Sequence, residues 1–252
     1  MHTIDLNCDL GEGCGSDADI VPLISSANIA CGAHAGDAST IRATLRLCAA
    51  HGVAAGAHPG YADREHFGRR ETGDDADAIA RSVTEQLAHF AALAREAGIA
   101  VSHVKLHGAL YNRAAEDLEV ADAIVRTVRA FDPATTLFGL SGSALLMIAA
   151  EAGLRVAHEV FPDRGYDLEG RLLPRSRPDA VIAAPEEVAD RAFLLAGMGL
   201  AKDERGRPLM LRADTLCLHG DRDDAVAIAQ AVRERLDRAG LRIVAPTTSA
   251  TP

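Results

Sequence analysis

Short apolar runs alternate with longer helical patterns along the chain, and this alternation constrains the fold more than any other feature. Residues 3–8, 27–31 and 53–57 have the length and apolar content of strands. The clearest helix is predicted over 75–97, where apolar residues recur every three or four positions until Gly98. Strands that alternate with helices in this way are typical of parallel βα units. We therefore expect an α/β fold, a single TIM-like β/α barrel with seven or eight strands.

The length of 252 residues suits one barrel domain, which we place at 1–245, followed by a flexible C-terminal tail at 246–252. A formal net charge of −10 disfavours nucleic acid and anionic membranes as partners, because both require a basic surface. The first five residues lack a signal pattern and no run of 18 apolar residues occurs, so we expect a cytoplasmic protein. A homo-oligomer stays an open alternative.

Cysteine usage and the missing nucleotide motifs disfavour several kinds of site. The five cysteines form no CxxC pair and are odd in number, which argues against a disulfide framework and against a structural zinc site. We expect buried, reduced thiols. No Walker-type phosphate loop and no GxGxxG segment after a strand is present, so a self-contained nucleotide site is not predicted. The GxSxG elbow of serine hydrolases is absent as well.

Four of the ten histidines stand directly after an apolar run and directly before a loop, namely His34, His58, His107 and His219. These positions mark the carboxyl ends of predicted strands. In a parallel barrel all such ends open onto one face, which is the face where barrel enzymes carry their active sites. We therefore expect the four imidazoles to gather around one pocket and to act in catalysis.

Acidic residues crowd the same strand ends. Asp9 and Glu12 follow the first strand and Asp37 follows the second, and we include all three in the predicted catalytic set. For Asp37 a helix-capping role is an equal alternative, because it precedes a predicted helix. Imidazoles and carboxylates together either move protons near neutral pH or bind a divalent metal that activates water. If a metal is bound, the expected ligands are His34, His58, His107 and Asp9.

Basic residues near the predicted pocket are candidates for binding an anionic substrate. Lys105 lies two residues before His107 on a strand, so both side chains point to the same side, and a buried lysine requires an acidic partner or a substrate anion. Two long loops, 59–73 and 161–178, carry arginines that could clamp a carboxylate or a phosphate. The predicted substrate-binding set is Asn7, Lys105, Tyr111, Arg64, Arg164, Arg175 and Asp221.

Six segments, in order and spread over almost the whole chain, share the pattern of one known family. They are DLNCDLGEG at 5–13, SANIACGAHAGD at 26–37, GAHPGYADREHFGRR at 56–70, HVKLHGALYN at 103–112, EVFPDRGYDLEGRLLPRS at 159–176 and CLHGD at 217–221. Together they resemble the LamB/YcsF family. The sequence departs from the usual family pattern at Ala33, Leu106 and 60–62, which affects pocket lining or loop stiffness and leaves every ionisable position intact.

The resemblance implies a seven-stranded β/α barrel of the glycoside hydrolase/deacetylase type. It also implies the opening of 5-oxoproline (pyroglutamate) to L-glutamate, with ATP as co-substrate, in a complex with 5-oxoprolinase subunits B and C. We hypothesise that the histidines and acids activate water while arginines or Lys105 hold the carboxylate and phosphoryl charge. Two alternatives stay open: a stand-alone metal-dependent amidohydrolase or deacetylase, and a non-catalytic subunit that binds the substrate for its partners.

Overall fold

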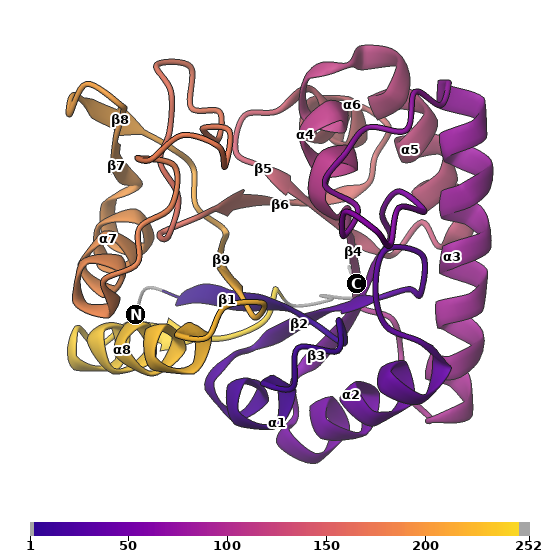
Figure 1. The fold of residues 1–252 in the computed structure, drawn as a ribbon, viewed down its shortest axis with the longest axis horizontal. Coiled ribbons are helices and arrows are strands. Elements are labelled where there is room, and N and C mark those ends of the chain that lie inside the picture. The colour runs from indigo at the N-terminus through magenta and orange to yellow at the C-terminus, as the bar shows by residue number, and fades with distance from the viewer. Residues whose placement is uncertain (1–2, 247–252) are drawn as a thin grey trace.

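The strands of this protein close into a parallel barrel (Figure 1). The computed structural model describes residues 3–246, so the expected tail lies outside the described residues except for Pro246. Each strand of the ring pairs in parallel with the next, and the last pairs again with β1. The ring consists of β1 (Thr3–Leu10), β2 (Ser26–Ala30), β3 (Ala54–His58), β4 (His103–Lys105), β5 (Thr136–Leu140), β6 (Arg155–Val160) and β9 (Thr215–His219). The expected seven-stranded barrel is confirmed.

Three short strands lie outside the ring. β10 (Arg242–Ile243) pairs in parallel with the start of β1. β7 (Leu200–Lys202) and β8 (Pro208–Met210) form an antiparallel hairpin that the apolar pattern did not predict. Because the hairpin strands have three residues each, they are too short to give a periodic signal.

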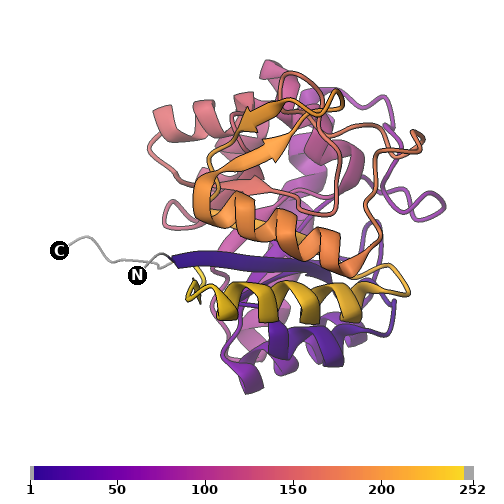
Figure 2. The ribbon, with the colours of Figure 1, turned by 90° about the vertical axis from the view of Figure 1, so that its left-hand side faces the viewer.

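Helices surround the barrel, and Figure 2 shows α7 and α8 running side by side along its wall. Three of the helices begin at an aspartate whose side chain accepts backbone N–H groups of the first turn, which satisfies otherwise unpaired donors. No helix within residues 3–246 combines the length and apolarity needed to cross a membrane. The helices are α1 (Asp17–Ile20), α2 (Ala38–His51), α3 (Ala76–Glu96), α4 (Gly108–Glu116), α5 (Leu118–Phe131), α6 (Ala144–Glu151), α7 (Pro185–Met198) and α8 (Ala225–Arg238), with a 3-10 turn at Val21–Leu23.

The interior of the barrel is polar, whereas most TIM-like barrels are filled by branched apolar side chains. On β1 the apolar residues alternate with Asp5, Asn7 and Asp9, and the strand is buried from Ile4 to Leu10. Side chains alternate between the two faces of a strand, so the apolar set packs beneath the helices and the polar set points into the barrel. The barrel interior is therefore a network of hydrogen bonds and ion pairs.

At the amino-terminal end of the barrel, the buried carboxylate of Asp5 accepts three hydroxyl hydrogen bonds. Its oxygens lie 2.6 Å from Ser25 Oγ, 2.8 Å from Ser26 Oγ and 2.6 Å from Thr215 Oγ1. Burial raises the pKa of Asp5 to about 6, although the three hydroxyl donors act in the opposite direction. This layer of hydrogen bonds around Asp5 connects β1, β2 and β9 at the end of the barrel that lies opposite the strands' carboxyl ends.

Above this layer, the ammonium group of Lys105 occupies the centre of the barrel. Its Nζ lies 2.7 Å from Asp9 Oδ1, 3.0 Å from Glu159 Oε1 and 2.9 Å from Cys217 Sγ. Burial opposes the charge of Lys105, but these partners outweigh it and raise its pKa well above the ordinary value. Asn7 Nδ2 donates to Glu159 Oε1 at 2.9 Å and so holds the second carboxylate in place.

Replacing Lys105 tests how much the barrel depends on this charge. We expect Lys105→Met to lower the free energy of unfolding by about 3–5 kcal/mol, because Asp9 and Glu159 would then be buried without a counter-charge. Glu159→Gln in the same chain should recover part of the loss. Urea unfolding of both variants measures this, with exposed Lys202→Met as a control that stays within about 0.5 kcal/mol of wild type. Equal free energies of unfolding for Lys105→Met and the control would contradict the stabilising role of the Lys105 charge.

The raised pKa of Asp5 predicts a pH-dependent stability. A carboxyl whose pKa is higher in the folded state stabilises the fold below its unfolded pKa of 3.8, and this contribution is lost as the pH rises through about 6. Relative to Asp5→Asn, which cannot ionise, wild type should lose about 3 kcal/mol of stability over that range. Denaturant unfolding between pH 3.5 and 7, roughly the span of the two pKa values, measures the difference. A stability difference that does not vary with pH would refute the prediction.

Candidate active site at the mouth of the barrel

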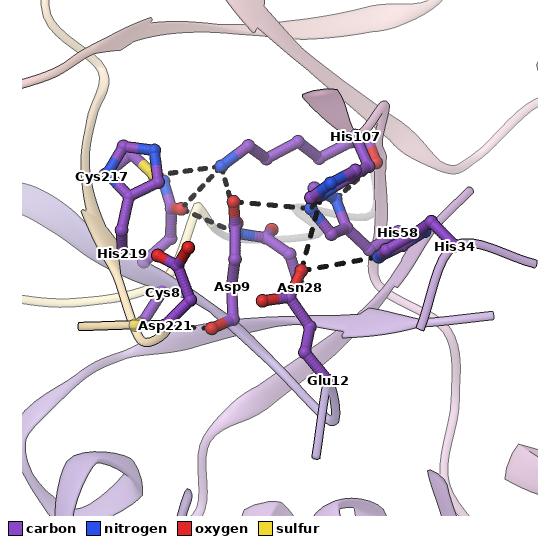
Figure 3. A network of polar contacts seen from close by, with 12 residues as sticks. Cys8, Asp9, Glu12, Asn28, His34, His58, His107, Cys217, His219 and Asp221 are labelled. Carbon is purple, nitrogen blue, oxygen red and sulfur yellow. Dashed lines mark hydrogen bonds and ion pairs between the residues drawn. The ribbon is translucent and has the colours of Figure 1, made fainter. Parts of the chain in front are cut away.

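Three of the four strand-end histidines meet at one side of the barrel mouth (Figure 3). His34 follows β2, His58 ends β3, and His107 precedes the first turn of α4. Their side chains are almost completely buried, as is that of Glu12 in the loop after β1. The nitrogen and oxygen atoms that these four residues offer lie within 4.8 Å of one another. Three of the four expected histidines therefore converge here with Glu12, whereas His219 lies on the other side of Asp9.

The four side chains make close contacts within the cluster. His58 Nε2 lies 2.9 Å from His107 Nδ1, and Glu12 Oε1 lies 3.3 Å from both His34 Nε2 and His107 Nδ1. The rings of His34 and His107 stack with centroids 3.8 Å apart. Burial lowers the pKa of His34 to about 3 and that of His107 well below its usual value, with a further contribution from neighbouring imidazoles. These two rings are therefore neutral at physiological pH.

Asp9 stands at the centre of the mouth, between the histidine cluster and His219 (Figure 3). Its Oδ1 accepts from Lys105 and from Asn28 Nδ2 at 2.8 Å, and its Oδ2 lies 3.3 Å from His58 Nε2. Burial alone would raise the pKa of Asp9, but the facing His58 and Lys105 hold it well below its ordinary value. His219 offers a ring nitrogen within 4.8 Å of the Asp9 carboxylate. Asp9 is thus an ionised link between both halves of the site.

Beside Asp9 a cavity of about 430 Å³ opens at the barrel mouth. Its walls carry more positive than negative charge, although the whole chain carries a net charge of −10. Arg164 is buried in this wall, and burial, together with the charge of Arg175, lowers its pKa to about 10. The cations of the lining are Arg69, Lys105, Arg164, Arg171 and Arg175, and the acids are Asp9 and Glu116. The cavity is suited to a small anion.

His219 lines this cavity, and the buried Asp163 orients its ring. His219 Nδ1 lies 2.7 Å from Asp163 Oδ2, and the imidazole ring stacks against Phe161. Burial alone would raise the pKa of Asp163, but the facing His219 and its hydrogen bond lower it. Because Nδ1 is occupied, Nε2 is the ring nitrogen that remains for a ligand. An imidazole held by a carboxylate in this way can accept and return a proton.

Several predicted site residues lie elsewhere or serve the framework. Asp37 is exposed and accepts from the backbone N–H groups of Ser39 and Thr40, so the structure gives it the capping role at the start of α2. Arg64 is exposed and donates to the carbonyl oxygens of Gly32 and Gly36, which fastens one loop to another. Asn7 lies deep in the barrel interior.

The remaining substrate-binding candidates do lie at the mouth. Lys105, Tyr111, Arg164 and Arg175 line the cavity. Arg164 also donates to the carbonyl oxygens of Ala180 and Leu173, so part of its hydrogen-bonding capacity is used to hold its own loop. Asp221 pairs with Arg69 across the rim.

Sequence reasoning missed four residues that shape the site: Asn28, Glu159, Asp163 and Cys217. Glu159 lies near the end of β6, and its partner Lys105 is distant in the sequence, so no local pattern indicates its role. Alternation of polar and apolar residues along β2 would have indicated that Asn28 points inward. Nothing local to Asp163 distinguishes it from the other charged residues of its loop.

Comparison with known proteins identifies close relatives. The chain is 48% identical to the A subunit of a 5-oxoprolinase from Syntrophobacter fumaroxidans, over 96% of this chain and 97% of that protein. Its fold is similar to that of the lactam utilization protein from Thermus thermophilus, with a TM-score of 0.90, 43% identity, and coverage of 97% of this chain and 100% of the other.

A more distant likeness concerns the fold alone. A family 4 carbohydrate esterase from Streptomyces lividans superposes with a TM-score of 0.52 at 10% identity, over 99% of this chain and 95% of the esterase. The two proteins thus share a barrel architecture. The model of one family matches residues 4–251, nearly the full length. The chain belongs to the LamB/YcsF family.

Proposed function

We propose that this chain is the A subunit of an ATP-dependent 5-oxoprolinase and that its barrel mouth opens 5-oxoproline to L-glutamate. The observation that carries the proposal is the His219–Asp163 pair on the wall of a cationic cavity, in a chain nearly half identical to the corresponding 5-oxoprolinase component of another organism. Subunits B and C are the proposed partners.

The cavity matches the chemistry of 5-oxoproline, a small cyclic amide with one carboxylate. A volume of about 430 Å³ accommodates such a molecule and leaves space for a phosphoryl group. Arg175 and Arg69 line the cavity and can bind the carboxylate or phosphoryl oxygens through charge-assisted hydrogen bonds. Lys105 is engaged by Asp9 and Glu159, so its main contribution is a fixed positive potential beneath the ligand.

The need for ATP follows from the lactam itself. An unstrained five-membered amide is a poor electrophile, and transfer of a phosphoryl group to its oxygen would turn that oxygen into part of a leaving group. Water then adds to the activated carbon, the ring C–N bond breaks, and the nitrogen leaves as an amine after it gains a proton. A second water releases phosphate from the resulting acyl phosphate to give glutamate.

In this scheme the residues of the chain position groups and move protons. His219 Nε2 removes a proton from the attacking water and returns it to the leaving nitrogen, while Asp163 orients the ring and stabilises its charged form. The arginines stabilise the negative charge that develops on oxygen. Since the sequence has no self-contained nucleotide motif, subunits B and C would complete the ATP site.

The direct experiment is to measure glutamate formation from 5-oxoproline by the purified chain with ATP, alone and with its two presumed partner subunits. The proposal predicts glutamate and ADP in equal amounts when all three subunits are present. No ATP-coupled glutamate formation under any combination would overturn it.

Two variants distinguish a catalytic subunit from one that only binds the substrate. In the assembled complex, His219→Ala and Asp163→Asn should lower kcat by roughly 10²–10⁴-fold, the range that general acid–base catalysis contributes. The exposed His89→Ala on α3 is the matched control and should retain wild-type kcat. A rise in KM with unchanged kcat in both site variants would instead indicate a purely binding role.

A second candidate function is metal-dependent amide hydrolysis without ATP, which the cluster of three histidines and Glu12 favours. The two functions differ in a simple assay. Amide or N-acetyl substrates would be cleaved by the isolated chain without ATP if this alternative holds, and they would be left intact if the chain acts as a 5-oxoprolinase component.

A further inference from the structure

The histidine cluster has a property that proton transfer alone does not explain: its hydrogen bonds fix where the ring protons lie. His58 Nδ1 lies 2.9 Å from the carbonyl oxygen of Lys105, and His107 Nε2 lies 2.8 Å from that of Phe67. A carbonyl oxygen only accepts, so each of these nitrogens carries the proton. The other ring nitrogens, His58 Nε2 and His107 Nδ1, therefore face one another.

These two nitrogen atoms lie only 2.9 Å apart, so at most one of them can carry a proton. Glu12 Oε1 adds an acceptor 3.3 Å from His107 Nδ1, and His34 Nε2 lies 3.3 Å from the same carboxylate oxygen. Nitrogen and oxygen atoms that carry lone pairs thus crowd the centre of the cluster, within 4.8 Å of one another. Such an arrangement is stabilised by a cation at the centre, either an extra shared proton or a metal ion.

The outer contacts of the cluster are those of metal-binding histidines. A histidine that binds a metal through one nitrogen donates the other N–H to a carbonyl or carboxylate, and His58 and His107 both do so. Within residues 3–246, Phe67 is the one non-glycine residue with a left-handed backbone, at φ 57°, and this conformation directs its carbonyl oxygen to His107. Backbone strain held at such a point is typical of a preorganised site.

Neighbouring backbone locks the rings in this arrangement. A Cβ atom at Gly68 would lie 2.9 Å from Cβ of His34 and 3.0 Å from Cδ2 of His107, so a larger side chain would displace both. Gly68 also has a φ of 64°, which disfavours other residues. The rings are thereby held with their free nitrogens facing the centre before any ligand binds.

We propose that Glu12, His34, His58 and His107 bind one divalent transition-metal ion of the zinc class. Three imidazole nitrogens and one carboxylate oxygen form a donor set that such ions prefer. Magnesium and calcium do not prefer this set, because they require mainly oxygen ligands. Glu12 is the fourth ligand because its carboxylate oxygen lies within 4.8 Å of the ligand atoms of all three histidines. Oδ1 of Asp9 is engaged by Lys105 and Asn28. Four protein ligands make a closed centre that fixes the loops after β1, β2, β3 and β4 next to Asp9.

This proposal does not depend on the substrate, so it is tested on the isolated chain without turnover. The untagged protein is treated with a chelator, dialysed and titrated with Zn²⁺ and with Co²⁺, following heat release, bound metal per chain and the visible absorption of tetrahedral Co²⁺. We expect one ion per chain and a higher Tm when it is bound. Glu12→Gln and His107→Gln should each weaken binding by at least about 100-fold, since even outer-shell changes cost roughly 10–100-fold.

His66→Gln is the matched control, because His66 is a partly exposed histidine of a loop at the same mouth, paired with Asp63. It should bind Zn²⁺ like wild type. Circular dichroism confirms that each variant is folded, and the isosteric Glu12→Gln keeps the test valid if His107→Gln does not fold. A folded wild type that takes up no stoichiometric metal, or equal affinities in Glu12→Gln and the control, would overturn the proposal and leave a shared proton as the central cation.

Discussion

The buried charge of Lys105 is the constraint on which the rest of the structure depends. A single ammonium group lies among two carboxylates and a thiol in the middle of the barrel, where an apolar barrel would have branched side chains. Once this cation is inside, Asp9 and Glu159 must lie beside it, and Asn7 must hold Glu159. The polar interior therefore fixes the position of the Asp9 carboxylate at the centre of the barrel mouth.

The mouth has two halves that share Asp9. On one side, three imidazoles and a carboxylate converge with very little exposure to solvent, which favours binding of a cation. On the other side, arginines surround an open cavity with an oriented His219 on its wall, which favours binding and conversion of an anion. The ionised Asp9 carboxylate lies between them and couples the electrostatics of one half to the other. The cavity is therefore locally cationic, although the chain as a whole carries a net charge of −10.

Sequence reasoning recovered the barrel and the convergence of the strand-end histidines, because both follow from period and direction in parallel βα units. It could not separate roles that depend on side-chain direction. Asp37 follows a strand as Asp9 does, yet its carboxylate turns back to cap a helix. Glu159 and Asp163 were missed because their importance comes from partners more than 50 residues away in the sequence, Lys105 and His219, and no local pattern indicates such pairs. The sequence likewise could not show which loop arginines line the cavity, as Arg164 and Arg175 do, and which hold loops together, as Arg64 does.

The most direct test of the central claim, that the cationic cavity is the substrate site, is a crystal structure of the chain soaked with 5-oxoproline. The account predicts the ligand in the cavity lined by Arg69, Arg175 and His219, with its carboxylate on an arginine and its lactam carbon on the side of His219 Nε2. A ligand bound outside this cavity, or bound with its lactam turned away from His219 toward solvent, would contradict the account.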